Sequence, residues 1–286
     1  MQIRRAVITA AGRTQRTLPL QTFVDRDGKE KTALQIIVEE VLSAGIEEIC
    51  LVIAPGDQSA YSAAAGEYVN RFHFVEQSAP LGYGQALSLA RQFTAREAFL
   101  HLVSDHLYIS SLPARCAQQV VEQARAEHCA VSAVQSTREH MLPYYGTVGG
   151  RRVPLRTDLY EIDSVLEKPT PSEAEQSLLV PGLRAGHYLC LFGIHVLTPS
   201  IMDLLYQRVT EAGGHSPVQL SAVLAAIVGR ERYLAYEVHG SRHNIGVKYG
   251  GLSAQLALAL AGADREEVLA QLVELLVQRS QGDVRS

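Results

Sequence analysis

The first residues whose types suggest chemistry lie close to the N-terminus. An apolar, β-branched run over residues 5–9 stops abruptly at a group of small and basic residues. This group is Ala10, Ala11 and Gly12, followed by Arg13 and Arg16. Small residues let a base or a phosphate approach the backbone, and arginine side chains donate several hydrogen bonds to phosphate oxygens. The pattern indicates a phosphate-binding loop after a strand, although an ordinary turn with two solvated arginines would read the same way.

Two further segments place polar side chains just after apolar runs. Gln77 follows residues 72–76 and precedes the turn Gly82-Tyr83-Gly84, which suits backbone contact with a flat base, but also a plain tight turn. Asp105 follows the apolar run 98–103. A carboxylate there either binds a Mg²⁺ ion that bridges phosphates or caps a helix or turn.

Strands and helices alternate along the first part of the chain. The runs 5–9, 48–54, 72–76 and 98–103 are typical of buried strands, and Thr32 with Gln35 forms a capping box before an apolar helical face that stops at Gly45. This alternation predicts a doubly wound parallel sheet, which binds ligands at the carboxyl ends of its strands. Function is therefore expected in the loops after Ala10, Val75 and Val103.

Composition narrows the class of protein. The chain has 286 residues, 47% hydrophobic and 20% charged, with a net charge of -4. These values predict a soluble globular protein without a nucleic-acid-binding surface, and no run is long enough for a membrane span. The four cysteines are scattered, without a C-x-x-C pair, so the cytoplasm is the expected compartment. His101, His106, His187 and His195 share no helical face, so structural or surface roles are expected for them in preference to a metal site, with His106 beside Asp105 as the exception.

Several segments occur in the order of the motifs of one known family. They are Ala10-Ala11-Gly12 with Arg16 and Pro19, residues 35–40, 44–49 and 80–86, Ser104-Asp105, residues 145–148, Glu167-Lys168-Pro169, and residues 193–199, 219–220 and 244–248. Over nearly its whole length the chain resembles the sugar-1-phosphate nucleotidyltransferases, most closely the bacterial UTP-glucose-1-phosphate uridylyltransferases.

The resemblance implies a fold and a reaction. The fold is a single α/β nucleotidyltransferase domain over residues 1–286, with a doubly wound, mostly parallel, Rossmann-like sheet and an inserted sugar-binding region around residues 140–190. Residues 1–135 would form the nucleotide-binding part, 136–250 the sugar-binding part and 251–286 the C-terminal helices. The reaction is nucleotidyl transfer from UTP to glucose 1-phosphate, dependent on Mg²⁺, giving UDP-glucose and pyrophosphate.

The resemblance also implies roles for individual residues. Asp105 and Asn244 would hold Mg²⁺, and Arg16 the β- and γ-phosphates of the triphosphate. Lys168 would hold the sugar phosphate, with Glu167 and Gly146 on the sugar. The nucleotide would lie on Ala10, Ala11, Gly12 and Arg13, with its uracil at Gln77 and Gly82.

The chain departs from the family at several of these positions. Thr14 and Gln15 replace a glycine and a threonine of the signature loop, and Asn244 replaces a metal-binding aspartate. The family's phosphate-neutralising lysine has no clear counterpart. The substitutes that remain are Arg26, Lys29 and Lys31. Two alternatives therefore stay open: the same chemistry with another sugar or base, and a nucleotide-sugar-binding regulatory protein that has lost turnover.

An apolar stripe near the C-terminus is the last feature. Asp264 and Glu267 suggest a helix start. The stripe consists of Val268, Leu269, Leu272, Val273, Leu275 and Leu276. It is expected to pack on its own domain, and as an alternative it offers an interface between subunits of a homo-oligomer.

Overall fold

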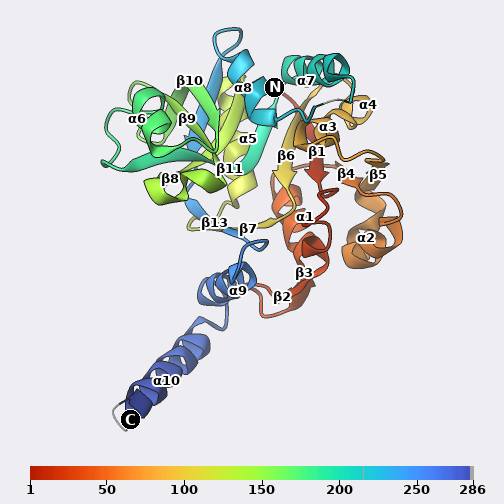
Figure 1. Cartoon of the computed structure of the whole chain (residues 1–286). Helices are drawn as coiled ribbons and strands as arrows, with labels where there is room; N and C mark the ends of the chain where they lie inside the picture. The colour runs from red at the N-terminus through yellow and green to blue at the C-terminus, as the bar shows by residue number, and fades with distance from the viewer. Residues whose placement is uncertain (215, 284–286) are drawn as a thin grey trace.

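Thirteen strands and ten α-helices make up the computed structural model, which describes residues 1–214 and 216–283 (Figure 1). The strands are β1 (Ile3–Thr9), β2 (Thr22–Val24), β3 (Glu30–Thr32), β4 (Glu48–Ile53), β5 (Phe72–Glu76), β6 (Ala98–Val103), β7 (His106–Ser110), β8 (Ala130–Arg138), β9 (Gly146–Arg152), β10 (Leu159–Glu167), β11 (His187–Leu197), β12 (Tyr233–Glu237) and β13 (Gly240–Asn244).

The helices connect and cover these strands. They are α1 (Ala33–Ser43), α2 (Gln58–Ala65), α3 (Tyr83–Ser88), α4 (Arg91–Thr94), α5 (Cys116–Glu127), α6 (Pro171–Ser177), α7 (Pro199–Ala212), α8 (Leu220–Ile227), α9 (Gly250–Leu260) and α10 (Arg265–Asp283). Three short 3-10 helices are η1 (Leu18–Leu20), η2 (Gly66–Arg71) and η3 (Glu139–Tyr144).

The main sheet is mixed. Its nine strands lie in the order β5-β4-β1-β6-β11-β8-β12-β10-β9, and β9 also pairs with β11. The predicted parallel arrangement is correct for β5, β4, β1 and β6. It is wrong for most of the other pairs, because β11 runs antiparallel to β6 and β8, and β10 antiparallel to β9 and β12. Residues 153–158, which join β9 to β10, are too few for the crossover that a parallel pair requires.

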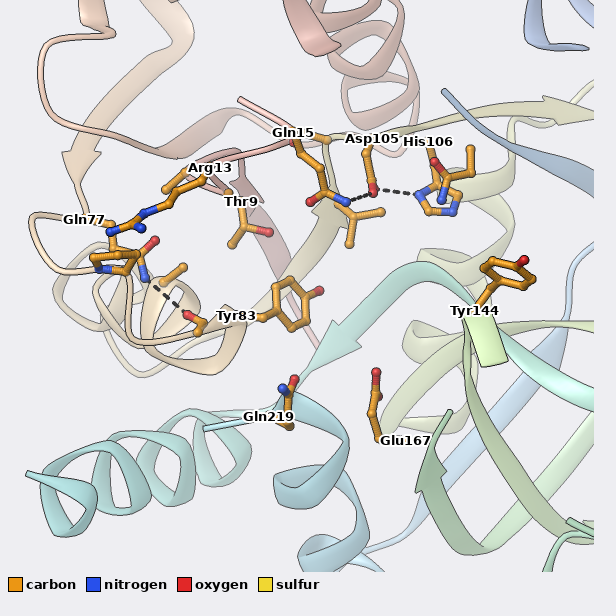
Figure 2. A pocket seen from close by; sticks show the side chains of 18 of the residues that line it. Thr9, Arg13, Gln15, Gln77, Tyr83, Asp105, His106, Tyr144, Glu167 and Gln219 are labelled. Carbon is orange, nitrogen blue, oxygen red and sulfur yellow. Dashed lines mark hydrogen bonds and ion pairs between the residues drawn. The ribbon is translucent and has the colours of Figure 1, made fainter. Parts of the chain in front are cut away.

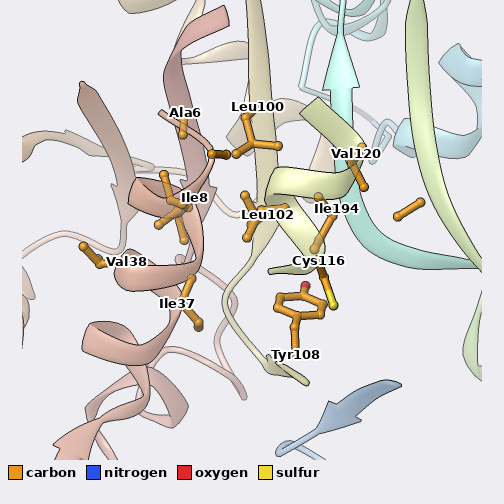
Figure 3. Packing of buried hydrophobic residues seen from close by; sticks show 14 of the residues in the cluster. Ala6, Ile8, Ile37, Val38, Leu100, Leu102, Tyr108, Cys116, Val120 and Ile194 are labelled. Atoms are coloured by element: carbon orange, nitrogen blue, oxygen red, sulfur yellow. The ribbon is translucent and has the colours of Figure 1, made fainter. Parts of the chain in front are cut away.

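Successive side chains of a strand point to opposite faces of the main sheet, and both faces are buried. On one face Ile8 of β1 belongs to a buried cluster with Ile37 of α1 and Val120 of α5 (Figure 3). On the other face its neighbour Val7 belongs to a cluster with Leu205 of α7. Full burial of each such side chain contributes about 1.5–3 kcal/mol. The sheet is thereby fixed between two layers of helices.

The start of α1 is the one that the sequence predicts. The backbone N–H of Gln35 donates to Thr32 Oγ1 at 3.1 Å, and the backbone N–H of Thr32 donates to Gln35 Oε1 at 2.8 Å. Both donors would otherwise lack a partner at the helix N-terminus. The helix ends before Gly45, which has a φ of 78°.

The parallel half of the sheet sends three loops to one edge. Ala10 N donates to Val52 O at 2.7 Å, and Gln77 N donates to Ile53 O at 2.8 Å, so the loops after β1 and β5 stay beside the end of β4. Asp105 follows β6, which pairs with β1 up to Thr9 and Val103. The loops after β1, β5 and β6 therefore meet at one edge of the sheet, as the parallel arrangement predicts.

The C-terminal helices lie away from the main sheet (Figure 1). Leu269, Val273 and Leu275 of α10 are 49%, 53% and 61% exposed, so the expectation that the apolar stripe packs on its own domain is wrong for these residues. Contact with the body is made just before α10, where Ala263 N donates to Arg26 O. Within residues 1–214 and 216–283, no helix is long and apolar enough to cross a membrane.

Two histidines form a buried pair at the centre of the sheet. His101 of β6 lies opposite His195 of β11, with ring centroids 5.9 Å apart. His101 Nδ1 donates to Val7 O at 2.9 Å, and His195 Nδ1 is hydrogen-bonded to Ser132 Oγ at 2.6 Å. Burial lowers the pKa of His101 to about 4. Burial and the neighbouring His101 lower the pKa of His195 to about 3.

This pair makes the fold sensitive to acid. A histidine in the unfolded chain has a pKa near 6.5, so the unfolded state binds more protons below that pH and stability falls as the pH is lowered from about 6.5 toward about 4. Asn at position 101 keeps a donor for Val7 and does not titrate. We expect the loss of unfolding free energy between about pH 7.5 and about pH 5 to be about 1–2 kcal/mol smaller in His101→Asn, measured by urea unfolding. His140→Gln, at an exposed histidine, serves as the control. An unchanged pH dependence in His101→Asn would contradict this assignment.

Candidate functional site

A cavity of about 750 Å³ lies at the carboxyl edge of the parallel strands (Figure 2). Its lining comes from the loops after β1, β5 and β6, the end of β10 and the residue before α8. A second cavity of about 140 Å³ adjoins it, and the two share Tyr83, Glu167 and Gln219. The two cavities are therefore neighbouring parts of one site.

Most of the candidate residues meet in this site. The larger cavity is lined by Ala11, Gly12, Arg13, Gln77, Gly82, Asp105, Glu167, Lys168 and Asn244. Gly146 lines the smaller cavity, beside Glu167. Ala10 is buried behind the loop. Arg16 lines neither cavity, and its Nε lies 3.5 Å from Asp57 Oδ2 in an ion pair.

Asp105 is held by two neighbouring side chains. Gln15 Nε2 donates to Asp105 Oδ2, and His106 Nδ1 donates to Asp105 Oδ1, each at 2.7 Å. Burial by itself would raise the pKa of Asp105, but the hydrogen bond and charge of His106, with the charge of Lys168, outweigh burial and lower it below the ordinary value. Asp105 is therefore an ionised carboxylate at neutral pH.

Asn244 is brought close to Asp105 by the two-stranded sheet of β13 and β7. β13 pairs with β7, and Asn244 lies opposite His106. Ile245 N also donates to Asp105 O at 2.9 Å. The side-chain oxygen of Asn244 accepts a hydrogen bond from Gly246 N at 2.8 Å. An amide oxygen has a second lone pair, so this bond leaves one acceptor position.

The oxygen donors at Asp105 and Asn244 fit Mg²⁺ only in part. No three His, Cys, Asp or Glu side chains in the described part of the chain are grouped so as to hold a metal ion. One carboxylate and one amide oxygen suit a Mg²⁺ that takes its other ligands from substrate phosphates and water, which is the usual mode for this ion.

Gln77 supports the loop that follows it. The side chain is buried, and its Nε2 donates to Gly82 O at 3.2 Å and to Gln85 Oε1. Gly82 has a φ of 98°, which favours glycine, and Gly84 N donates to Val218 O at 2.9 Å. The loop is thereby fixed between β5 and the segment before α8.

The other end of the site is built by the pairing of β9 with β10. Their register places Gly146 opposite Glu167. A Cβ at Gly146 would lie 2.9 Å from Leu191 Cδ1 and 3.2 Å from Glu167 Oε2, so the glycine lets both side chains approach the backbone closely. Lys168 has a φ of 46°, in the left-handed region that is uncommon for a residue with a side chain.

The three basic residues considered as substitutes for the missing lysine line neither cavity. Lys31 Nζ lies 2.9 Å from Asp25, 3.1 Å from Asp27 and 2.7 Å from Glu39. Burial by itself would lower the pKa of Lys31, but the hydrogen bonds to these carboxylates raise it. Lys31 is therefore occupied within its own ion cluster.

Sequence reasoning missed several lining residues, among them Thr9, Gln15 as a partner of Asp105, Tyr83 and Tyr144. Tyr83 projects between the Gln77 side and the Glu167 side of the site (Figure 2). Its hydroxyl is hydrogen-bonded to His101 Nε2. Gln15 and Tyr83 stand within or beside recognised motifs, so departure from the motif is the signal that could have identified them.

Comparisons with known proteins agree with this architecture. The family model described as nucleotidyl transferase matches residues 5–243. UTP-glucose-1-phosphate uridylyltransferase 2 of Streptococcus pyogenes serotype M3 is 27% identical, over 96% of this chain and 96% of the relative. UTP-glucose-1-phosphate uridylyltransferase 1 of the same serotype is 28% identical, over 91% of this chain and 90% of the relative.

Solved structures share the fold. A UDP-glucose pyrophosphorylase complexed with UDP-glucose superposes with a TM-score of 0.72 at 23% identity, covering 90% of this chain and 98% of that one. The UTP-bound UGPase from Acinetobacter baumannii has a TM-score of 0.71 at 21% identity, covering 95% of this chain and 99% of that one. The mixed α/β fold is therefore the fold of these structures.

The close approach at Gly84 generates a prediction. A Cβ there would lie 2.6 Å from Val218 O, so Gly84→Ala forces the loop away from the segment before α8 and weakens the backbone hydrogen bond. We expect unfolding free energy to fall by about 1–3 kcal/mol in urea titrations. Gly251→Ala, also at the second position of a helix, has its nearest neighbour at 3.9 Å and should stay within about 0.5 kcal/mol of the natural protein. Equal stability of Gly84→Ala and the natural protein would contradict the predicted clash.

Proposed function

The chain belongs to the nucleotidyl transferase family, and on that premise we propose that it transfers a uridylyl group from UTP to a sugar 1-phosphate, with glucose 1-phosphate as the leading substrate. In this reaction a phosphate oxygen of the sugar 1-phosphate attacks the α-phosphorus of UTP. The bond from that phosphorus to its bridging oxygen breaks, and pyrophosphate leaves. One observation carries the proposal: a single site joins the Gln77–Gly82 end to the Glu167–Lys168 end.

The nucleotide is proposed to occupy the end formed by the loops after β1 and β5. The uracil would lie against Gln77 and Gly82, which both line the larger cavity. The phosphates would lie over Ala11 and Gly12, with Ala10 behind them, and Arg13 supplies a guanidinium in the cavity lining. Arg16 would have to exchange its partner Asp57 for the β- and γ-phosphates.

The sugar 1-phosphate is proposed to occupy the opposite end. Glu167 can accept hydrogen bonds from sugar hydroxyls, and both Glu167 and Gly146 line the smaller cavity. Lys168 lines the larger cavity, so its ammonium would neutralise the sugar phosphate. Such a reaction needs alignment and charge neutralisation more than covalent help from the protein.

Asp105 and Asn244 are the residues that would hold Mg²⁺. A bound Mg²⁺ would supply neutralisation of the phosphate charge. The contribution of this chain is the ionised carboxylate of Asp105, kept in place by His106, and the amide oxygen of Asn244.

Two alternatives have support in the site. The first is the same chemistry with another base or another sugar. Backbone contacts at Gly82 discriminate weakly among bases, so they do not fix the base. Asn244 in place of a carboxylate and the engagement of Asp105 by Gln15 favour a nucleotide-sugar-binding regulatory protein with weak turnover. Pyrophosphate release, measured with Mg²⁺, each nucleoside triphosphate and a panel of sugar 1-phosphates, separates the three functions.

The cellular setting is proposed on separate grounds. The four cysteines are free and buried, which is typical of a reducing compartment such as the cytoplasm. The exposed apolar residues of α10 make a homo-oligomer the proposed assembly.

One prediction of the proposed function concerns the nucleotide base. Because Gln77 and the Gly82 turn are proposed to contact uracil, UTP and UDP-glucose should bind more tightly than ATP or GTP in calorimetric titrations. Equal or tighter binding of ATP, GTP or dTTP would remove the uridine assignment.

The second prediction concerns Lys168. If its ammonium holds only the sugar phosphate, Lys168→Ala should weaken sugar 1-phosphate binding by about tenfold or more and leave UTP affinity nearly unchanged. Initial rates against each substrate measure the two effects. Lys29→Ala, at an exposed lysine outside both cavities, should change neither. Unaltered sugar kinetics in Lys168→Ala would exclude Lys168 from the sugar-phosphate site.

A further inference from the structure

Gln15 belongs to the loop that follows β1, and its side chain is hydrogen-bonded to the carboxylate of Asp105. Figure 2 shows its side chain directed from that loop toward Asp105. Its Nε2 donates to Asp105 Oδ2 at 2.7 Å, and a Cβ added at Gly12 would lie 3.1 Å from Gln15 Oε1. The side chain therefore passes beside Gly12, which stays exposed, and donates to one oxygen of the carboxylate.

The other oxygen of Asp105 is also engaged, by His106 Nδ1 at 2.7 Å. Asp105 is only 7% exposed, so little water competes for either oxygen. The orientation of the Gln15 amide follows from chemistry, because an ionised carboxylate only accepts hydrogen bonds and must face the NH₂ group. The Gln15 amide therefore turns its NH₂ group toward Asp105. In this orientation its oxygen is not available there as a ligand for a metal ion.

The surroundings of Gln15 allow its side chain to move while the backbone stays in place. Gln15 N and Arg16 N both donate to Gly12 O, at 3.0 and 2.8 Å. Gln15 is an exposed residue, so its amide can turn from Asp105 into water with no loss of core packing. A hydrogen bond to a charged group is among the stronger ones in proteins. Although Oδ2 keeps a further lone pair, a cation that coordinates it meets the positive end of the Gln15 amide beside it, so the two compete for this oxygen.

We propose that Gln15 is a positioning residue that competes with a divalent cation for Asp105 Oδ2, so that the cation binds only when the Gln15 amide turns away. The proposal rests on the proposed function in one respect, the presence of a cation at Asp105. It deepens that function, because the cation would have to reach a higher concentration before it binds, and Gln15 in the loop after β1 would set that concentration.

Binding of Mn²⁺ to the nucleotide-free protein tests the proposal. Mn²⁺ takes the same oxygen donors as Mg²⁺, and the signal of the free ion in electron paramagnetic resonance reports how much is bound. We expect Gln15→Ala and Gln15→Met, which keeps the volume of the side chain but not its donor, to bind Mn²⁺ about tenfold more tightly than the natural protein. Asp105→Asn should lose this binding. Thr14→Ala, at the exposed neighbouring residue, should leave it unchanged.

Three results would overturn the proposal. Unchanged affinity in both Gln15 variants means that Gln15 does not compete, and weaker affinity means that its amide is itself a ligand. Absence of any Mn²⁺ binding that depends on Asp105 removes the site. Thermal unfolding verifies that each variant is folded before titration. A failure of the proposed function is seen separately, as absent pyrophosphate release with every triphosphate, because the Mn²⁺ titration contains neither nucleotide nor sugar.

Discussion

The parallel register of β4, β1 and β6 is the constraint on which the site depends. Because all three strands run in the same direction, the loops that follow Thr9 and Val103 emerge at one edge, and β5 adds Gln77 beside them. β11 runs antiparallel to β6 and is the first strand of the second half of the sheet. There β9 and β10 bring Gly146 to Glu167. Each half of the site thus comes from a different mode of strand pairing.

Several polar groups of the site are hydrogen-bonded to one another in this structure. Asp105 accepts from Gln15 and His106, and Gln77 donates to Gly82 O. Buried polar groups without partners are costly, so a site proposed to bind phosphate and a cation has to offer substitutes until the ligand arrives. Ligand binding at such a site is an exchange of hydrogen bonds, and its strength depends on how easily the internal partners leave. Gln15 is exposed and can leave, whereas His106 is buried on β7.

Departures from the family pattern are located in loops and at strand ends. Gln15 lies in the loop after β1, and Asn244 is the last residue of β13. The core residues beneath them, such as Ile8 and Leu102, pack as a continuous cluster. Loops carry few buried contacts, so they tolerate exchange of polar residues while the sheet keeps their positions. The sheet can therefore keep the fold of the nucleotidyl transferase family while polar residues differ at such loop and strand-end positions.

Local features of this protein could be predicted from the sequence alone. The bounds of β5 and β6, the capping box of Thr32 and Gln35, and the gathering of Asp105 with the first loop depend on hydrophobic periodicity and on neighbours a few residues apart. Only the tertiary structure decided the antiparallel half of the sheet, the ion cluster of Lys31, and the exposure of Leu275 on α10. The pair formed by Gln15 and Asp105 belongs with these, because hydrogen-bond and ion-pair partners are chosen among groups that meet only after the chain has folded.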